Sequence, residues 1–287
     1  MRRTRTVVLA AVVGVLVVAT AFVGGALTGK HLATGTETSP EAPEQRVIVY
    51  GDSLVVQAEP YLSAVAHAFR LHVDVRAFGG LAPCDALAGL ADDLRHSRPH
   101  LVVFAFSGNS LSNCMRDANG ELARGLDILT KYRSDIETAI KMTTQAGVPF
   151  VLASPPASED HSDAWKALDS VYRDIAAEHD PLVQYTDAGE QIAPAGEFTE
   201  TQRCLPFELD LPQSRTACQD DGGMIGVRAL DGVHFCSNPP TATTTAPACT
   251  EYSSGAFRYG IALVSAARLD LDYFAALSSL PSAAFPP

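Results

Sequence analysis

The chain alternates short apolar runs with longer segments of helical periodicity, and this alternation constrains the fold more than any other feature. Runs typical of buried strands occur at Arg46–Tyr50, Leu71–Phe78, Leu101–Phe106, Val148–Ala153 and Leu182–Tyr185. Segments long enough for helices occupy Val55–Arg70, Asp85–His96, Glu121–Ala146, Ser162–His179 and Ser254–Leu277. Strict alternation of this kind predicts an α/β domain over residues 46–279, with one doubly wound, mostly parallel sheet of five strands and helices on both faces.

The N-terminal 29 residues have the composition of an export segment. Arg2, Arg3 and Arg5 precede an uncharged stretch from Thr6 to Gly29 that is rich in Val, Ala and Leu. Because about 20 apolar residues suffice to span a bilayer, we expect residues 1–29 to form a signal anchor with its arginines in the cytoplasm. A cleaved signal peptide, giving a secreted protein, is the alternative. Residues 30–45 are predicted to form a linker and residues 280–287 a C-terminal tail.

Six cysteines in an exported chain indicate three disulfides. Nearest neighbours suggest Cys204–Cys218 and Cys236–Cys249, which leaves Cys84 with Cys114. A metal site is the competing interpretation of a cysteine set. The chain has neither a CxxC pair nor an HExxH sequence, so we expect no metal.

The segment 189–250 interrupts the alternation of strands and helices. It is rich in Pro, Thr and Gly, holds four of the six cysteines and contains no long periodic element. A long irregular segment in an ordered domain is usually functional or an insertion. We therefore expect an insertion that disulfides stabilise in place of a hydrophobic core.

Four short polar segments follow the predicted strands. Gly51-Asp52-Ser53-Leu54 follows the first strand, Gly79-Gly80 the second and Ser107-Gly108-Asn109-Ser110 the third, and Asp231-Gly232-Val233-His234 lies in the insertion after the fifth. In open α/β sheets, ligands bind outside the carboxyl ends of the strands. These segments are therefore predicted to meet at one edge of the sheet or in a loop that folds over it.

This set of segments resembles the SGNH (GDSL-type) family of serine esterases and lipases, over about residues 46 to 275. The resemblance implies a three-layer α/β/α, flavodoxin-like fold. It also implies a catalytic triad of Ser53 as nucleophile, His234 as general base and Asp231 as the acid that orients the histidine. The implied oxyanion donors are the backbone N–H groups of Ser53 and Gly80 and the side-chain amide of Asn109.

Elementary chemistry supports these roles. A serine hydroxyl is a weak nucleophile until a base accepts its proton, and a histidine beside a carboxylate is suited to that task. A tetrahedral oxyanion needs preorganised N–H donors, which glycine and asparagine can supply. The third segment departs from the family pattern, because Ser110 stands where an Asp is usual. That position normally supports the turn, so we expect little consequence.

The sequence therefore predicts an exported serine esterase that cleaves acyl or acetyl esters through an acyl-enzyme, without a cofactor. We expect it to be a membrane-anchored monomer whose substrate is an ester, such as an acylated cell-envelope glycan or a lipid. An acyltransferase that passes the acyl group to or from an envelope sugar, and a non-catalytic envelope-binding domain, are the alternatives. His161 and Trp165 are candidates for lining the pocket. The net charge of −12 argues against nucleic acid as a partner.

Overall fold

Five parallel strands form the centre of the molecule. The computed structural model describes residues 44–159, 162–236, 249 and 251–278. Its main sheet has the strand order β2-β1-β3-β4-β5, and every neighbouring pair is parallel. The strands are β1 (Gln45–Gly51), β2 (Leu71–Ala77), β3 (Leu101–Ala105), β4 (Phe150–Ala153) and β5 (Val183–Thr186). This order is the flavodoxin-like one, so the predicted α/β fold with a five-stranded parallel sheet is confirmed.

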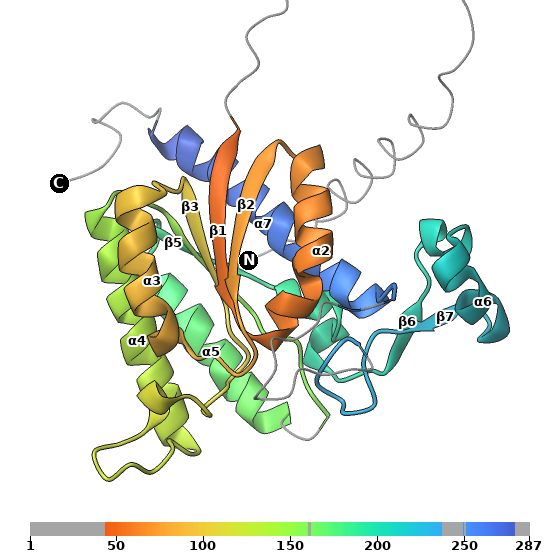
Figure 1. The fold of residues 1–287 in the computed structure, drawn as a ribbon, viewed down its shortest axis with the longest axis horizontal. Coiled ribbons are helices and arrows are strands. Elements are labelled where there is room, and N and C mark those ends of the chain that lie inside the picture. Colours follow the sequence, from red (N-terminus) through yellow and green to blue (C-terminus); the bar gives the residue numbers. More distant parts are fainter. Residues whose placement is uncertain (1–43, 160–161, 237–248, 250, 279–287) are drawn as a thin grey trace, which may run out of the picture. The chain divides into compact units, whose positions relative to one another are not determined.

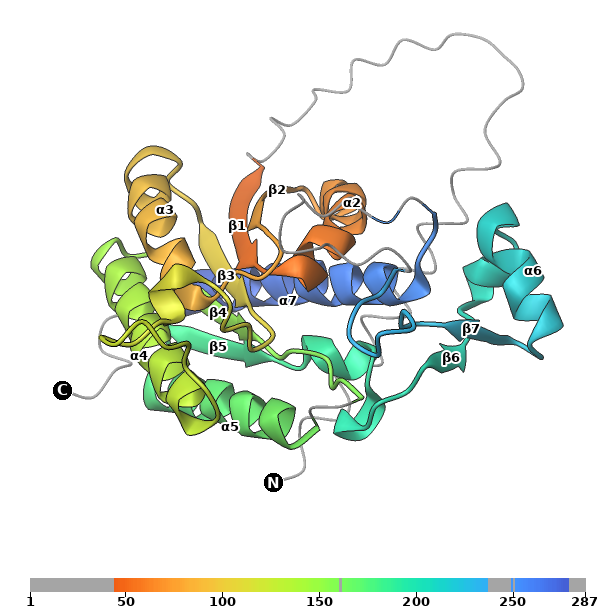
Figure 2. The same ribbon diagram turned by 60° about the horizontal axis from the view of Figure 1, so that its bottom comes forward.

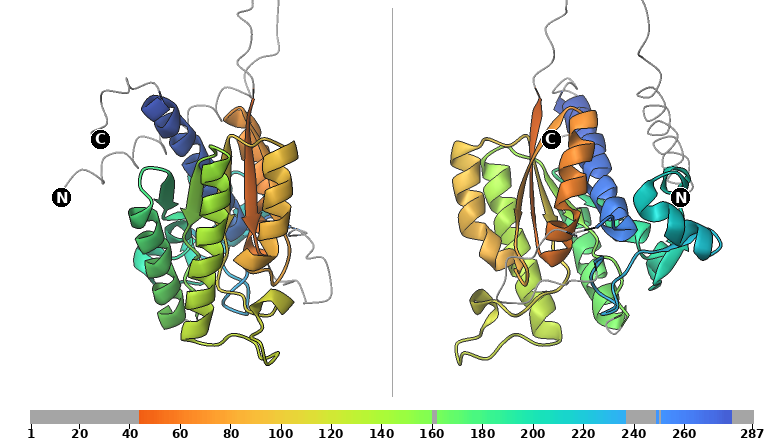
Figure 3. Two further views of the ribbon diagram at one scale, coloured as in Figure 1. Left: turned by 90° about the vertical axis from the view of Figure 1, so that its left-hand side faces the viewer. Right: turned by 45° about the vertical axis from the view of Figure 1, so that its right-hand side comes forward.

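Helices cover both faces of the sheet. One face packs against α2 (Ser53–Ala68) and α7 (Ser254–Ser278), and the other against α3 (Pro83–His96), α4 (Leu126–Gln145) and α5 (Ser162–Glu178). The right-hand view of Figure 3 shows α2 and α7 on one side of β1, and α3 and α4 on the other. Because both faces are covered, every residue of β3 and β4 is buried. The predicted three-layer architecture is therefore present.

The carboxyl ends of the strands define one edge of the sheet. In Figure 1 the arrows of β1 and β2 point to the end of the sheet at which α2 begins. Gly51 ends β1 and Ser53 is the first residue of α2, so Asp52 alone separates the strand from the helix. The first helix begins two residues before its predicted start at Val55. The reason is that Asp52 caps it, accepting a hydrogen bond from the Leu54 N–H at 3.1 Å.

The segment after β5 contains short elements that periodicity did not reveal. They are α6 (Pro212–Asp220), the antiparallel strands β6 (Thr201–Arg203) and β7 (Met224–Gly226), and 3-10 turns at Ala188–Gln191, Pro194–Gly196 and Pro206–Leu209. A further 3-10 turn, Asn113–Met115, follows β3. Figure 2 shows β6, β7 and α6 projecting away from the main sheet.

The six cysteines form the pairs Cys84–Cys114, Cys204–Cys218 and Cys236–Cys249, which are the pairs that nearest neighbours suggest. Most of the expected linker 30–45, the expected anchor over 1–29 and the tail 280–287 lie outside the described residues. Among the helices that the structure describes, none combines the length and the hydropathy needed to cross a bilayer.

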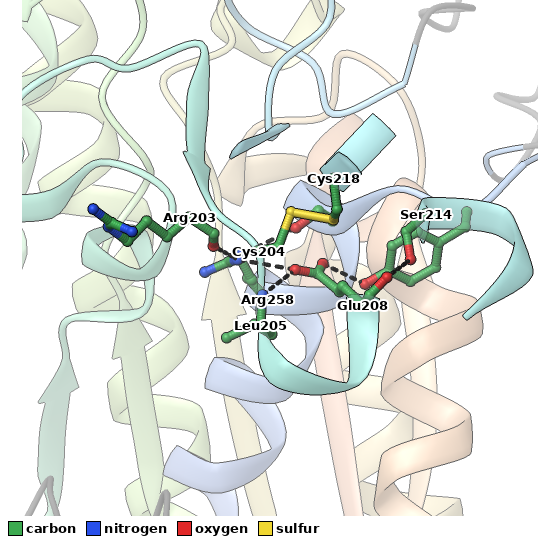
Figure 4. The surroundings of a disulfide bond; sticks show 9 residues. Arg203, Cys204, Leu205, Glu208, Ser214, Cys218 and Arg258 are labelled. Carbon is green, nitrogen blue, oxygen red and sulfur yellow. Dashed lines mark hydrogen bonds and ion pairs between the residues drawn. A yellow bond between two sulfur atoms is a disulfide. The ribbon is translucent and has the colours of Figure 1, made fainter. Parts of the chain in front are cut away.

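A buried ion pair joins the insertion to α7 (Figure 4). The Glu208 carboxylate is fully buried and accepts hydrogen bonds from the Leu205 N–H, the Tyr252 hydroxyl at 2.6 Å and Arg258 Nη2 at 3.2 Å. Arg258, on α7, also donates to Arg203 O at 2.7 Å and to Gln202 Oε1 at 3.0 Å. This polar cluster connects the insertion to α7, while the Cys204–Cys218 bond crosslinks two positions within the insertion itself.

Replacement of Glu208 tests that attachment. We expect Glu208→Leu to lower the free energy of unfolding by about 3–5 kcal/mol, because it leaves the buried Arg258 guanidinium without its carboxylate partner. Asp92→Asn is the matched control, since it breaks an ion pair with Arg95 in which both side chains are about two-thirds exposed. Such a pair contributes about 0–1 kcal/mol. Chemical denaturation measures both values, and equal losses would contradict the interpretation.

Candidate active site

Ser53, His234 and Asp231 form a continuous chain of hydrogen bonds. His234 Nε2 lies 3.0 Å from Ser53 Oγ, and His234 Nδ1 lies 2.7 Å from Asp231 Oδ2. The tautomer with its proton on Nδ1 satisfies both contacts, because Nδ1 then donates to Asp231 while Nε2 accepts from Ser53. The structure thus brings the three residues together in the order that proton transfer from a serine requires.

Asp231 holds the loop that carries His234. Its Oδ1 accepts hydrogen bonds from the N–H groups of Val233 at 3.0 Å and His234 at 2.9 Å. Partial burial favours the neutral carboxyl, but the hydrogen bonds from His234 and Val233 outweigh it and keep the pKa of Asp231 below its usual range. An ionised Asp231 can stabilise a positive charge on the imidazole ring.

Asp52 connects the loop after β3 to the start of α2. It is fully buried, and its Oδ2 accepts hydrogen bonds from the Ser107 N–H at 2.7 Å, the Ser107 hydroxyl at 2.6 Å and Asn109 Nδ2 at 2.9 Å. Burial raises the pKa of Asp52, although the hydrogen bonds from Ser107, Leu54 and Asn109 oppose that shift. One carboxylate therefore fixes both the start of the helix that carries Ser53 and the side chain of Asn109.

Three N–H donors remain available near Ser53. The Ser53 N–H lies at the first turn of α2, where backbone donors have no partner within the helix. Within the described parts of the chain, neither this group nor the Gly80 N–H donates a hydrogen bond. Asn109 Nδ2 has a second hydrogen beyond the one directed at Asp52. Gly80 has a φ of +80° and Gly108 a φ of +100°, so both turns use a conformation that glycine readily adopts.

Two buried polar side chains that sequence reasoning missed support the His234 loop. Gln57, one turn after Ser53 on α2, is fully buried and accepts a hydrogen bond from the Phe235 N–H at 2.8 Å. Arg228 donates to Val233 O at 2.6 Å and to Ala157 O in the loop after β4. Burial lowers the pKa of the Arg228 guanidinium to about 10. One sequence signal could have singled out Gln57: it is a polar residue at a position on the apolar face of α2.

The remaining candidates are placed as follows. Trp165 is half-buried on α5, and its Nε1 donates to Pro155 O in the loop after β4. A Cβ added to Gly196 would lie 2.9 Å from the Trp165 ring, so the indole packs against the insertion. His161 lies outside the described residues.

Among the described residues, the grouping of possible metal ligands is Cys84, Asp85 and Cys114. Its two sulfurs are joined in a disulfide and cannot bind a metal as thiolates.

Comparison with known proteins adds fold likenesses at low identity. Neither a protein-family model nor a curated protein matches the chain. A GDSL-like lipase from Bacteroides thetaiotaomicron is 14% identical, with a TM-score of 0.48, over 80% of this chain and 89% of the other. An acetyl xylan esterase is 15% identical, with a TM-score of 0.47, over 77% and 98%. A lipase/acylhydrolase from Enterococcus faecalis is 15% identical, with a TM-score of 0.39, over 64% and 100%.

Neighbouring atoms pack so closely around Gly51 that the position has no room for a side chain, and this can be tested. A Cβ there would lie 2.2 Å from Val55 Cγ2 and 2.8 Å from Ala105 O. We therefore expect Gly51→Ala to lower the free energy of unfolding by about 1–3 kcal/mol, the usual cost of overpacking. Gly226→Ala is the control, because a Cβ at Gly226 would meet nothing within 4 Å. Thermal or chemical unfolding that shows similar losses for both variants would contradict this account.

Proposed function

We propose that the protein is an exported serine esterase that hydrolyses carboxylic esters through an acyl-enzyme on Ser53. The observation that carries this proposal is the hydrogen-bonded chain from Ser53 through His234 to Asp231, at 3.0 Å and 2.7 Å. A structural turn serine needs no such partners. The resemblance of the four sequence segments to SGNH hydrolases supports the same function.

The reaction divides into two steps. Ser53 Oγ attacks the ester carbonyl carbon while its proton passes to His234 Nε2, and the carbonyl becomes a tetrahedral oxyanion. The N–H groups of Ser53, Gly80 and Asn109 donate to that oxyanion. When the intermediate collapses, the alcohol leaves with the proton from His234. Water then attacks the acyl-enzyme with His234 again as base, releasing the acid and restoring Ser53.

The disulfides support the proposed compartment. Such bonds form and persist in oxidising environments and are rare in the cytosol of mesophiles. The described residues contain three of them. We propose that the uncharged run from Thr6 to Gly29, which lies outside the described residues, directs and anchors the domain outside the cytoplasm.

A fluorophosphonate probe tests the nucleophile. Such probes modify a serine that a base has activated, so the wild-type protein should be labelled and Ser53→Ala should not. Ser110→Ala, which removes a hydroxyl from a neighbouring segment, is the matched control and should label like the wild type. An unlabelled wild type, or a labelled Ser53→Ala protein, would contradict the assignment of Ser53.

Substitution of Asn109 tests the oxyanion hole. Loss of one donor to the oxyanion commonly lowers kcat by about 10²–10³-fold while KM stays similar. We expect that result for Asn109→Ala with a soluble ester, and near wild-type kinetics for Ser110→Ala. Melting temperatures should accompany the kinetics, because Asn109 also donates to Asp52. An effect on KM alone, or equal effects in both variants, would assign Asn109 a purely structural role.

A further inference from the structure

Exposed apolar side chains stand beside three of the four segments proposed to do chemistry. Phe78 is 39% exposed and directly precedes Gly79-Gly80, while Leu111 is 62% exposed and follows Asn109 by two positions. Leu230 is fully exposed and directly precedes Asp231. Single exposed apolar residues are common on protein surfaces. Here three of them occur on three separate loops that converge on Ser53, which indicates an apolar partner for this edge.

A groove of about 400 Å³ opens beside one of these loops. It lies between β2 and α3, and its lining includes Tyr50, Arg76, Phe78, Leu81, Ala86 and Gly89. Phe78 and Leu81 flank the glycine pair that carries the proposed oxyanion donor. One wall of the groove is therefore continuous with the Gly80 loop.

Several polar groups of the groove already have partners within the protein. The Tyr50 hydroxyl donates to Asp93 at 2.6 Å, and Arg76 Nε donates to the same carboxylate at 3.0 Å. Asp85 Oδ2 accepts a hydrogen bond from the Ala82 N–H at 2.9 Å. Sugar hydroxyls would compete with these internal bonds, whereas the ring of Tyr50 and the side chains of Phe78 and Leu81 offer apolar surface. These contacts favour a hydrocarbon occupant.

The groove lies at a defined separation from the nucleophile. Tyr50 precedes Ser53 by three residues, and the Phe78 N–H donates to Gly51 O at 3.4 Å. Three residues of chain span at most about 10 Å. An acyl group bound to Ser53 would therefore enter the groove beyond its first few carbons, and an acetyl group would not reach it.

We propose that this groove binds the alkyl chain of the acyl group, and that the substrates are esters of medium-chain or longer fatty acids. This inference rests on the proposed esterase function and specifies its substrate class. Acetate esters react without the groove and gain nothing from it.

A series of p-nitrophenyl esters from acetate to octanoate, hydrolysed by the full chain, tests the proposal. Because each methylene that leaves water contributes about a fourfold factor, we expect kcat/KM to rise about tenfold or more from butyrate to octanoate. Gly89→Leu fills the groove: a Cβ at Gly89 would meet the Tyr50 ring at an ordinary 3.8 Å, and leucine suits a helix. This variant should lose about tenfold on octanoate and keep its rate on acetate.

Four results decide between the possible outcomes. Leu182→Ser, which alters a half-exposed leucine at the opposite edge of the sheet, should leave the ratio of octanoate to acetate rates unchanged. An unchanged ratio in Gly89→Leu would overturn the groove assignment. A loss confined to acetate esters of long-chain alcohols would also overturn it, because the groove would then bind the alcohol. Hydrolysis that persists in Ser53→Ala would instead overturn the proposed function, so the two failures are distinguishable.

Discussion

The buried carboxylate of Asp52 is the interaction on which the rest of the site depends. It caps α2 through the Leu54 N–H and accepts three hydrogen bonds from Ser107 and Asn109. A carboxylate removed from water is costly unless its oxygens are hydrogen-bonded, and here both oxygens are. The β1–α2 junction and the loop after β3 are consequently held at a fixed separation, which sets Ser53 against Asn109.

The loop that carries His234 is held against this framework from two sides. Gln57 binds the backbone after His234, and Arg228 binds the backbone before it while also reaching the loop after β4. Both side chains are largely buried, and each retains one buried nitrogen without a partner in the described structure. A buried nitrogen without a hydrogen-bond partner lowers the stability of the folded protein. That Gln57 and Arg228 nevertheless lie beside His234 favours a role for both side chains in positioning the histidine.

Much of the fold and of the candidate site could be predicted from the sequence, because both depend on local patterns. Alternating apolar and helical segments predict the five strands and the helices around them, and the strand ends then predict which polar segments converge. The exact residues at which helices and strands begin and end were less predictable. Val148 was expected to open β4, but its N–H closes the end of α4 on Thr143 O at 2.9 Å, and the strand begins at Phe150.

The insertion and the supports of the site could not be predicted in this way. The strands β6 and β7 span three residues each, too few to show periodicity. Glu208 and Arg258 are fifty residues apart in the chain, so nothing local marks them as partners. The roles of Gln57 and Arg228 likewise come from contacts between distant segments, which a single sequence does not display.

The separation of Ser53 from His234 along the chain has a consequence for how the molecule matures. The two residues are 181 positions apart, and the segment between them includes four of the five sheet strands and the whole of β6, α6 and β7. The serine is thus synthesised long before the histidine that accepts its hydrogen bond. Until the last third of the chain has docked on α2, the Ser53 hydroxyl lacks its proton acceptor, so a partly synthesised chain carries an ordinary, unactivated serine.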